Sequence, residues 1–94
     1  MTPLSIDYPI SVAILYTTYD PDTIEVAMQM NEALTSCGHK VRMFETTAYN
    51  WKKALRVPGD VVINWIEDEN TDWKLWAKVG HNLELLHRAQ LGFS

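Results

Sequence analysis

The sequence predicts a small Rossmann-like α/β unit of three layers, in which a parallel sheet lies between helices. Two almost continuously apolar runs, residues 10–16 and 61–66, have the β-rich composition of strands that are covered on both faces. Segments with helical composition alternate with these strands along the chain. The expected order is β-α-β-α-β-α, and this alternation implies parallel strands joined by right-handed crossovers.

The first strand, residues 10–16, leads through a turn into a helix that is expected to begin at Asp20. Asp20 is a suitable N-cap, and Pro21 fits the first helical position, where its missing N–H costs nothing. Gly38 stands where a left-handed C-terminal cap belongs. Two adjacent stripes are expected to form a broad face against the sheet: Ile24, Ala27, Asn31 and Leu34, and Val26, Met30, Ala33 and Cys37.

The second strand is expected at residues 40–46, where polar and apolar residues alternate as in a more peripheral strand. A short helix within residues 48–57 and a third strand at 61–66 follow. The remainder has helical composition, and we expect Gly80 to separate one helix from a last helix over residues 81–92. That last helix contains His87, and its apolar side is expected to consist of Leu83, Leu85, Leu86, Ala89 and Gln90. A final strand is expected to be lacking, which would leave sheet edges open to another chain or domain.

Composition limits the class of protein. Ninety-four residues allow one domain, 1–94. The net charge is −4 without runs of Lys or Arg, which argues against nucleic-acid and anionic-membrane partners. The single cysteine, Cys37, excludes an intramolecular disulfide, and no secretory signal or apolar run of membrane-spanning length is visible. We therefore expect a cytoplasmic soluble domain.

Candidate site residues follow the carboxyl ends of the expected strands, where open α/β sheets bind their ligands. Thr17 and Thr18 follow the first strand and can donate to a phosphate or a carboxylate, or else only form the turn. The loop has no glycine, so neither a dinucleotide fingerprint nor a P-loop is present. Glu25, in the first turn of the helix, would either bind a substrate ammonium group or compensate the helix dipole.

Acidic residues follow the third strand. Glu67, Asp68, Glu69 and Asp72 offer oxygen ligands for a hard cation, but their spacing does not match a calcium loop, and a solvated loop is the alternative. Glu67 is the acid that we expect to face a ligand. No histidine pair, zinc-ligand spacing or nucleophile motif is present, so no catalytic residue and no metal ligand is assigned.

The chain resembles the N-terminal, pre-ATP-grasp domain of D-alanine–D-alanine ligase and related ATP-grasp ligases. "VAILYTTYD", "IEVAMQMNEAL" and "CGHKV" look like the opening strand, the first helix with its Glu-Val pair and the return into the second strand. "DVVINWIEDE" is similar to the family's "D-V-V-F-N" strand, and "LELLHRAQLGFS" to its "LLE-LGIP-TG" helix and turn. Thr17-Thr18 stands where the family commonly has Gly-Gly, so the likeness is to a broader ligase-like relative.

The resemblance implies the N-terminal fragment of a larger ligase that joins a carboxylate to an amine and is inactive alone. The domain would line one wall of the substrate cleft, with Glu25 at the position that contributes to binding the amino group of an amino-acid-like substrate. ATP and Mg²⁺ would be bound by central and C-terminal domains, so no cofactor is expected in this chain. The partner would be those domains or a dimer mate.

Two other classes of function remain open. One is a standalone flavodoxin-like or receiver-like interaction or regulatory module. A receiver also needs a lysine beyond a later strand, which is not expected in this chain, and Thr17 occupies the place of a phosphotransfer cysteine. A weaker hypothesis is an independent enzyme that uses a metal in the acidic loop. The four tryptophans suit either a core or an interface with another domain: Trp51, Trp65, Trp73 and Trp76.

Overall fold

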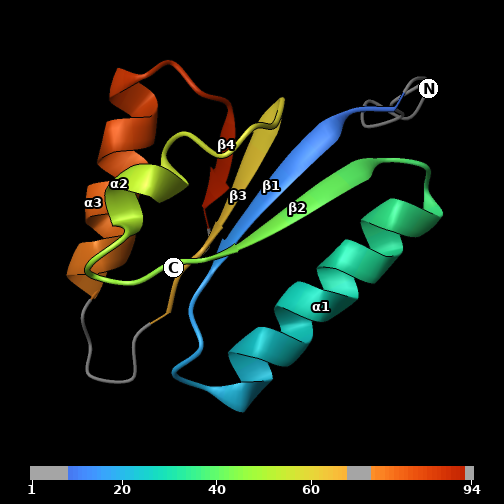
Figure 1. The fold of residues 1–94 in the computed structure, drawn as a ribbon, viewed down its shortest axis with the longest axis horizontal. Coiled ribbons are helices and arrows are strands. Elements are labelled where there is room, and N and C mark those ends of the chain that lie inside the picture. Colours follow the sequence, from blue (N-terminus) through green and yellow to red (C-terminus); the bar gives the residue numbers. More distant parts are fainter. Residues whose placement is uncertain (1–8, 68–72, 93–94) are drawn as a thin grey trace.

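A four-stranded parallel sheet forms the centre of the molecule in the computed structural model, which describes residues 9–67 and 73–92. The elements are β1 (Ser11–Tyr16), α1 (Pro21–Ser36), β2 (Lys40–Glu45), α2 (Trp51–Ala54), β3 (Val61–Trp65), α3 (Trp73–Leu85) and β4 (Gln90–Gly92). The strand order is β2-β1-β3-β4, and each adjacent pair is parallel (Figure 1). The predicted Rossmann-like α/β class is confirmed.

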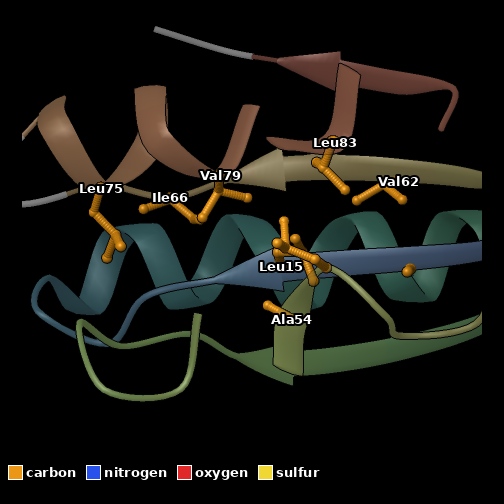
Figure 2. Close-up of a cluster of buried hydrophobic side chains, with 9 residues drawn as sticks. Leu15, Ala54, Val62, Ile66, Leu75, Val79 and Leu83 are labelled. Carbon is orange, nitrogen blue, oxygen red and sulfur yellow. The ribbon is translucent and has the colours of Figure 1, made fainter. Parts of the chain in front are cut away.

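Each face of the sheet has its own apolar core, because successive side chains of a strand point to opposite faces. Val12 and Ile14 of β1 face α1, where they pack with Ala27 and Ile63. The alternate side chains of β1 and β3 face α2 and α3 on the other side (Figure 2): Ala13, Leu15, Val62 and Ile66 pack there with Ala54, Leu55, Leu75, Val79 and Leu83. Because both faces of the sheet are covered, successive side chains of β1 and β3 are buried, which accounts for their continuous apolar runs. Burying each large aliphatic side chain stabilises the fold by about 1.5–3 kcal/mol.

Helix α1 begins and ends as its sequence predicts. The Asp20 carboxylate accepts a 2.9 Å hydrogen bond from the backbone N–H of Asp22, and Pro21 is the first helical residue. At the other end, Gly38 has a φ of +90°, and the backbone N–H of His39 reaches the carbonyl of Leu34. These bonds form a Schellman cap, which requires the left-handed conformation that glycine adopts without strain.

The face of α1 is narrower than predicted. Ala27 is buried, and Met30 and Leu34 pack beside it, but Val26, Ala33 and Cys37 of the second expected stripe are exposed. Helix α1 packs on β1 and β2. Helices α2 and α3 pack on the opposite face of the sheet, so among the described residues no second helix covers the flank of α1. The prediction of the second stripe was therefore wrong for Val26, Ala33 and Cys37, and only its Met30 packs on the sheet.

The C-terminal third also differs from the prediction. Helix α3 runs through Gly80 without a break and ends at Leu85, so the expected separation at Gly80 and the last helix over 81–92 were wrong. His87 has a φ of +56° and lies in the turn after α3 rather than within a helix. Residues 90–92 form the short strand β4, which extends the sheet beside β3, so the expectation that a final strand is lacking was wrong.

Two smaller predictions can be compared with the structure as well. β2 is an edge strand with alternating burial, as its sequence indicates. The short helix expected within residues 48–57 is one turn, α2. No helix in the described part of the chain combines the length and the apolarity that crossing a bilayer requires.

Candidate functional site

The candidate site is the rim at the carboxyl ends of β1 and β3. From β1 the chain passes through α1 to β2 on one side, and from β2 it crosses back through α2 to β3 on the other side of β1. The helix after β1, α1, and the helix after β3, α3, therefore cover opposite faces of the sheet (Figure 1). In open α/β sheets this switch point is where ligands bind.

Thr17 is fully buried at this rim and is bonded to the backbone of Glu67. Its hydroxyl donates to the Glu67 carbonyl oxygen and accepts a 3.0 Å hydrogen bond from the Glu67 N–H. A hydroxyl has a single proton to donate, so the donor of Thr17 is already used. Thr17 thus fastens the end of β3 to the end of β1 instead of presenting a donor to a ligand.

The side chain of Glu67 is held by the first turn of α1. Thr23, which is 2 % exposed, donates from its hydroxyl to Glu67 Oε2 at 2.5 Å. The backbone carbonyl of Thr23 accepts a 3.0 Å bond from the indole Nε1 of Trp65. These contacts orient the Glu67 carboxylate, while the residue as a whole remains exposed to solvent at the rim. A carboxylate fixed in this way is preorganised to meet a cationic group.

The other two predicted site residues do not join this arrangement. Thr18 is exposed and forms no part of the bonded set of Thr17, Thr23 and Glu67. Glu25 is exposed on α1, and helical geometry puts it about 200° around the axis from Thr23. Because Thr23 faces the sheet, Glu25 lies on the outward side of the helix. The structure therefore brings Thr17 and Glu67 together and leaves Glu25 apart from them.

The charges at the rim favour a cation over an anion. The described residues of the loop after β1 and the first turn of α1 carry Asp20 and Asp22 and no basic side chain, and Glu67 adds a third carboxylate. These residues do not fit a nucleotide phosphate, which requires N–H donors from glycines or a basic side chain. No group of three or more His, Cys, Asp or Glu among the described residues is arranged to hold a metal ion. Asp68, Glu69 and Asp72 of the expected acidic loop lie outside the described residues.

The loop after β2 is a third part of the rim, and sequence reasoning did not single out its residues. The Asn50 side chain accepts from the Thr47 N–H at 2.7 Å and donates to the Glu45 carbonyl at 2.9 Å. The Thr47 hydroxyl accepts from the N–H groups of Tyr49 and Asn50, both at 3.1 Å. This turn presents Tyr49 with 99 % of its surface exposed. Thr and Asn three residues apart are a signal for such a side-chain-bonded turn.

A polar seam runs between α3 and the strands β3 and β4, away from the rim. Asn64 Nδ2 donates to the Trp76 carbonyl at 3.2 Å, and Gln90 Nε2 donates to the Gly80 carbonyl at 2.9 Å. Asn64 is fully buried, and its Oδ1 has no hydrogen-bond partner among the described residues; the same holds for the buried Trp76 Nε1. Beside the seam lies an open hollow of about 380 Å³, lined by Trp76, Ala77, Gly80, His81, Glu84 and Gln90. The lone Asn within the apolar run 61–66 is the sequence signal that could have indicated this seam.

Comparison with known proteins adds no assignment. No protein-family model, no curated protein and no solved structure matches this chain.

Proposed function

We propose that this chain is the substrate-side domain of an ATP-dependent carboxylate–amine ligase of the D-alanine–D-alanine ligase-like kind, inactive by itself. Its role would be to bind the ammonium group of an amino-acid-like substrate at the β1/β3 rim. The observation that carries the proposal is the Glu67 carboxylate, which is oriented by Thr23 and exposed at the switch point of the sheet.

The charges of the rim support an ammonium ligand. An ammonium group has three donors and one positive charge, and it bonds a fixed carboxylate more strongly than a neutral donor does. Thr17 contributes indirectly, because its two bonds to the Glu67 backbone fix the position from which the carboxylate extends. Thr18 is exposed beside Thr17 and remains a candidate for a longer substrate, whereas Glu25, on the outward side of α1, would meet a substrate only if the ligand extends past the rim.

The phosphate chemistry of such a ligase would belong to domains outside this chain. When bound there, ATP and Mg²⁺ would activate the substrate carboxylate as an acyl phosphate, which an amine then attacks. The acidic rim is unsuited to hold triphosphate, so the part of this chain is to bind and orient the amino-acid end of the substrate. Central and C-terminal ligase domains are the partners that the proposal requires.

An NMR titration of the chain tests this proposal. We expect D-alanine to shift the backbone amide signals of Thr17, Thr18 and Glu67, with a dissociation constant on the order of 1 mM, which corresponds to about 4 kcal/mol. The variant Glu67→Gln should bind roughly tenfold more weakly because it loses the charge. Glu84→Gln, which removes an exposed glutamate from α3, is the matched control and should leave binding unchanged.

Two results would contradict the proposal. The first is a shift of the same amide signals by Mg²⁺–ATP, which would assign the nucleotide to this rim. The second is the absence of any response to D-alanine and to a panel of other amino acids at concentrations well above the expected constant.

A second candidate is a standalone flavodoxin-like or receiver-like interaction module. The strand order β2-β1-β3-β4 favours it, because flavodoxin-like sheets share this order and bind their ligands at the same β1/β3 switch point. For this candidate, the titration with FMN in place of D-alanine should perturb the amides of Thr17 and Glu67. No response to FMN together with a response to D-alanine would decide for the ligase domain.

A further inference from the structure

The charged residues of the two helical layers differ in sign. Helix α1 and its N-cap contain no Lys or Arg, and their charged residues are Asp20, Asp22, Glu25 and Glu32. On the other layer, residues 51–56 and 73–85 contain a single acid, Glu84, and five bases: Lys52, Lys53, Arg56, Lys74 and Lys78. This comparison covers the described residues and leaves out 68–72. Protein surfaces normally mix acidic and basic side chains, so this separation of the two signs between the helical layers is unusual. It occurs in a chain whose net charge is −4.

The acidic residues of α1 form a stripe on its outward side. Asp22, Glu25 and Glu32 are all exposed, and helical geometry puts them within about 80° of one another around the axis. Met28 lies next to this stripe and is 60 % exposed. We call this surface the acidic face. It points away from the sheet, because the opposite side of α1 packs on β1 and β2.

The other layer presents a basic surface with aromatic side chains. All five of its bases are exposed, and Lys74 and Lys78 are one helical turn apart on the same side of α3. Lys78 Nζ lies 5.2 Å from the ring centroid of Trp51, and Lys52 Nζ lies 5.8 Å from it, so Trp51 joins α2 to α3. Tyr49 is held out beside α2 by the turn of Thr47 and Asn50. We call this surface the basic face.

We propose that copies of this chain associate head to tail, with the acidic face of one copy against the basic face of the next. The charges of the two faces are complementary, and the exposed Met28 and Tyr49 supply apolar contacts of the kind that anchor interfaces. Association of this kind follows from the charges of the two faces and does not depend on the proposed ligase role.

The geometry also determines the kind of assembly. The two faces belong to opposite sides of the sheet, so a copy bound on one face leaves the other face open (Figure 1). A contact between two different surfaces is heterologous, and it continues into a chain of copies unless the rotation closes a ring. The assembly therefore differs from a two-fold dimer formed through the short edge strand β4, which would stop at two copies.

Sedimentation velocity and light scattering across a concentration series test the proposal. In about 0.01 M salt, the mean mass should rise past that of a dimer as the protein concentration increases. In about 1 M salt, where the Debye length falls from about 30 Å to about 3 Å, the protein should return to a monomer. A protein that is monomeric at low salt throughout the series, or whose mass stops at a dimer, overturns the proposal.

Charge reversal provides the sharper test. The double variant Glu25→Lys/Glu32→Lys makes both faces basic. Lys74→Glu/Lys78→Glu leaves three bases against two introduced acids and so removes most of the positive charge of the basic face. Each variant alone should therefore associate at least roughly tenfold more weakly than the wild type. Mixing the two variants should restore association, because each now offers a face that is complementary to the other. Lys40→Glu, an exposed substitution on the edge strand β2 outside both faces, is the control and should behave as the wild type.

Circular dichroism should show that all variants are folded, since every substitution is on the surface. If the mixture stays monomeric while both variants are folded, charge pairing between copies is not the cause of association. If the wild type stays monomeric but binds a polyglutamate peptide through Lys74 and Lys78, the basic face serves another acidic partner and the proposal is wrong.

Discussion

The hydroxyl of Thr17 bonds both the N–H and the carbonyl of Glu67, which is 50 residues away in the sequence. One buried side chain thereby joins the loops that leave β1 and β3 at the switch point of the sheet. Thr23 continues the connection by binding the carboxylate of Glu67 from α1. The rim is thus assembled from three elements by two threonines, and the orientation of the Glu67 carboxylate depends on both of them.

Replacing Thr17 tests this connection. Thr17→Val keeps the shape of the side chain but leaves two backbone groups of Glu67 without their partner, so we expect the free energy of unfolding to fall by about 2 kcal/mol. Thr17→Ser keeps the hydroxyl and should cost clearly less. Urea denaturation measures both. Thr18→Val, on the exposed neighbour, should change stability by less than about 0.5 kcal/mol, and an equal loss in both valine variants would refute a special role for Thr17.

Replacing Asn64 should change the free energy of unfolding in the opposite direction. The buried Oδ1 of Asn64 has no partner among the described residues. Its Nδ2 donates to the carbonyl of Trp76, but that carbonyl lies within helix α3, where a backbone N–H group also bonds it. We therefore expect Asn64→Leu to raise the free energy of unfolding by about 1 kcal/mol, because a buried polar group is replaced by an apolar one of similar size.

Asn82 provides the control for that substitution. Its Nδ2 makes the same kind of bond, to the Lys78 carbonyl at 2.8 Å, but on the solvent side of α3. Asn82→Leu should leave the urea midpoint within the error of the wild type. If Asn64→Leu is strongly destabilising instead, Oδ1 is satisfied in solution, for example by a buried water, and the seam is a complete polar network.

The strands β1, β2 and β3 and the helix α1 were predictable because local and tertiary preferences agree there. The apolar runs of β1 and β3 correspond to burial on both faces, and Asp20, Pro21 and Gly38 mark the ends of α1 by backbone chemistry alone. In the C-terminal third, local signals and packing disagree. A glycine within a helix costs about 1 kcal/mol, and the burial of Leu75, Val79 and Leu83 along one side of α3 exceeds that cost across Gly80.

The end of α3 was missed for a related reason. The N–H of Arg88 bonds the Leu83 carbonyl, and the N–H of His87 bonds the Glu84 carbonyl, which is the same Schellman arrangement that Gly38 forms after α1. Here a histidine occupies the left-handed position, so the usual glycine signal is absent. β4 was missed because three residues are too few to show a periodic pattern.

The candidate site was predictable only in part. Parallel strands bring their carboxyl ends to one edge, so the sequence could indicate that Thr17 and Glu67 share the rim. That they bond to each other depends on the separation of β1 and β3 and on the path of both loops, which no local pattern encodes. The outward position of Glu25 follows in the same way from which side of α1 is buried.

The two helix caps allow a paired substitution. Gly38 has a φ of +90°, and the space that a Cβ would occupy there is open, so Gly38→Ala should cost about 1 kcal/mol through backbone strain and not through a clash. His87 has a φ of +56°, so His87→Gly should relieve strain and raise stability by about 0.5 kcal/mol. Thermal and urea denaturation should show these opposite signs; two losses would mean that the side chain of His87 contributes a contact of its own.

Arg88, in the turn before β4, joins that turn to the segment between α2 and β3 by a forked pair of hydrogen bonds. Its Nη1 donates to the Leu55 carbonyl at 2.8 Å, and its Nη2 donates to the Gly59 carbonyl at 2.9 Å. Arg88→Met keeps much of the aliphatic stem but removes both donors, so we expect a loss of about 1–2 kcal/mol. Arg88→Lys should recover only part of it, because one ammonium group cannot reproduce the planar fork.

Hydrogen exchange locates the effect of the Arg88 substitution. The N–H of Val62 bonds the Ala89 carbonyl, so loosening the turn that precedes β4 should speed exchange at Val62 more than at Ile14 in the centre of β1. Arg56→Met, at an exposed position in the same loop that Arg88 bonds, should leave both the stability and the exchange pattern unchanged. Uniform acceleration at Val62 and Ile14 would show that Arg88 supports the whole fold and not β4 in particular, since both amides would then exchange through global unfolding.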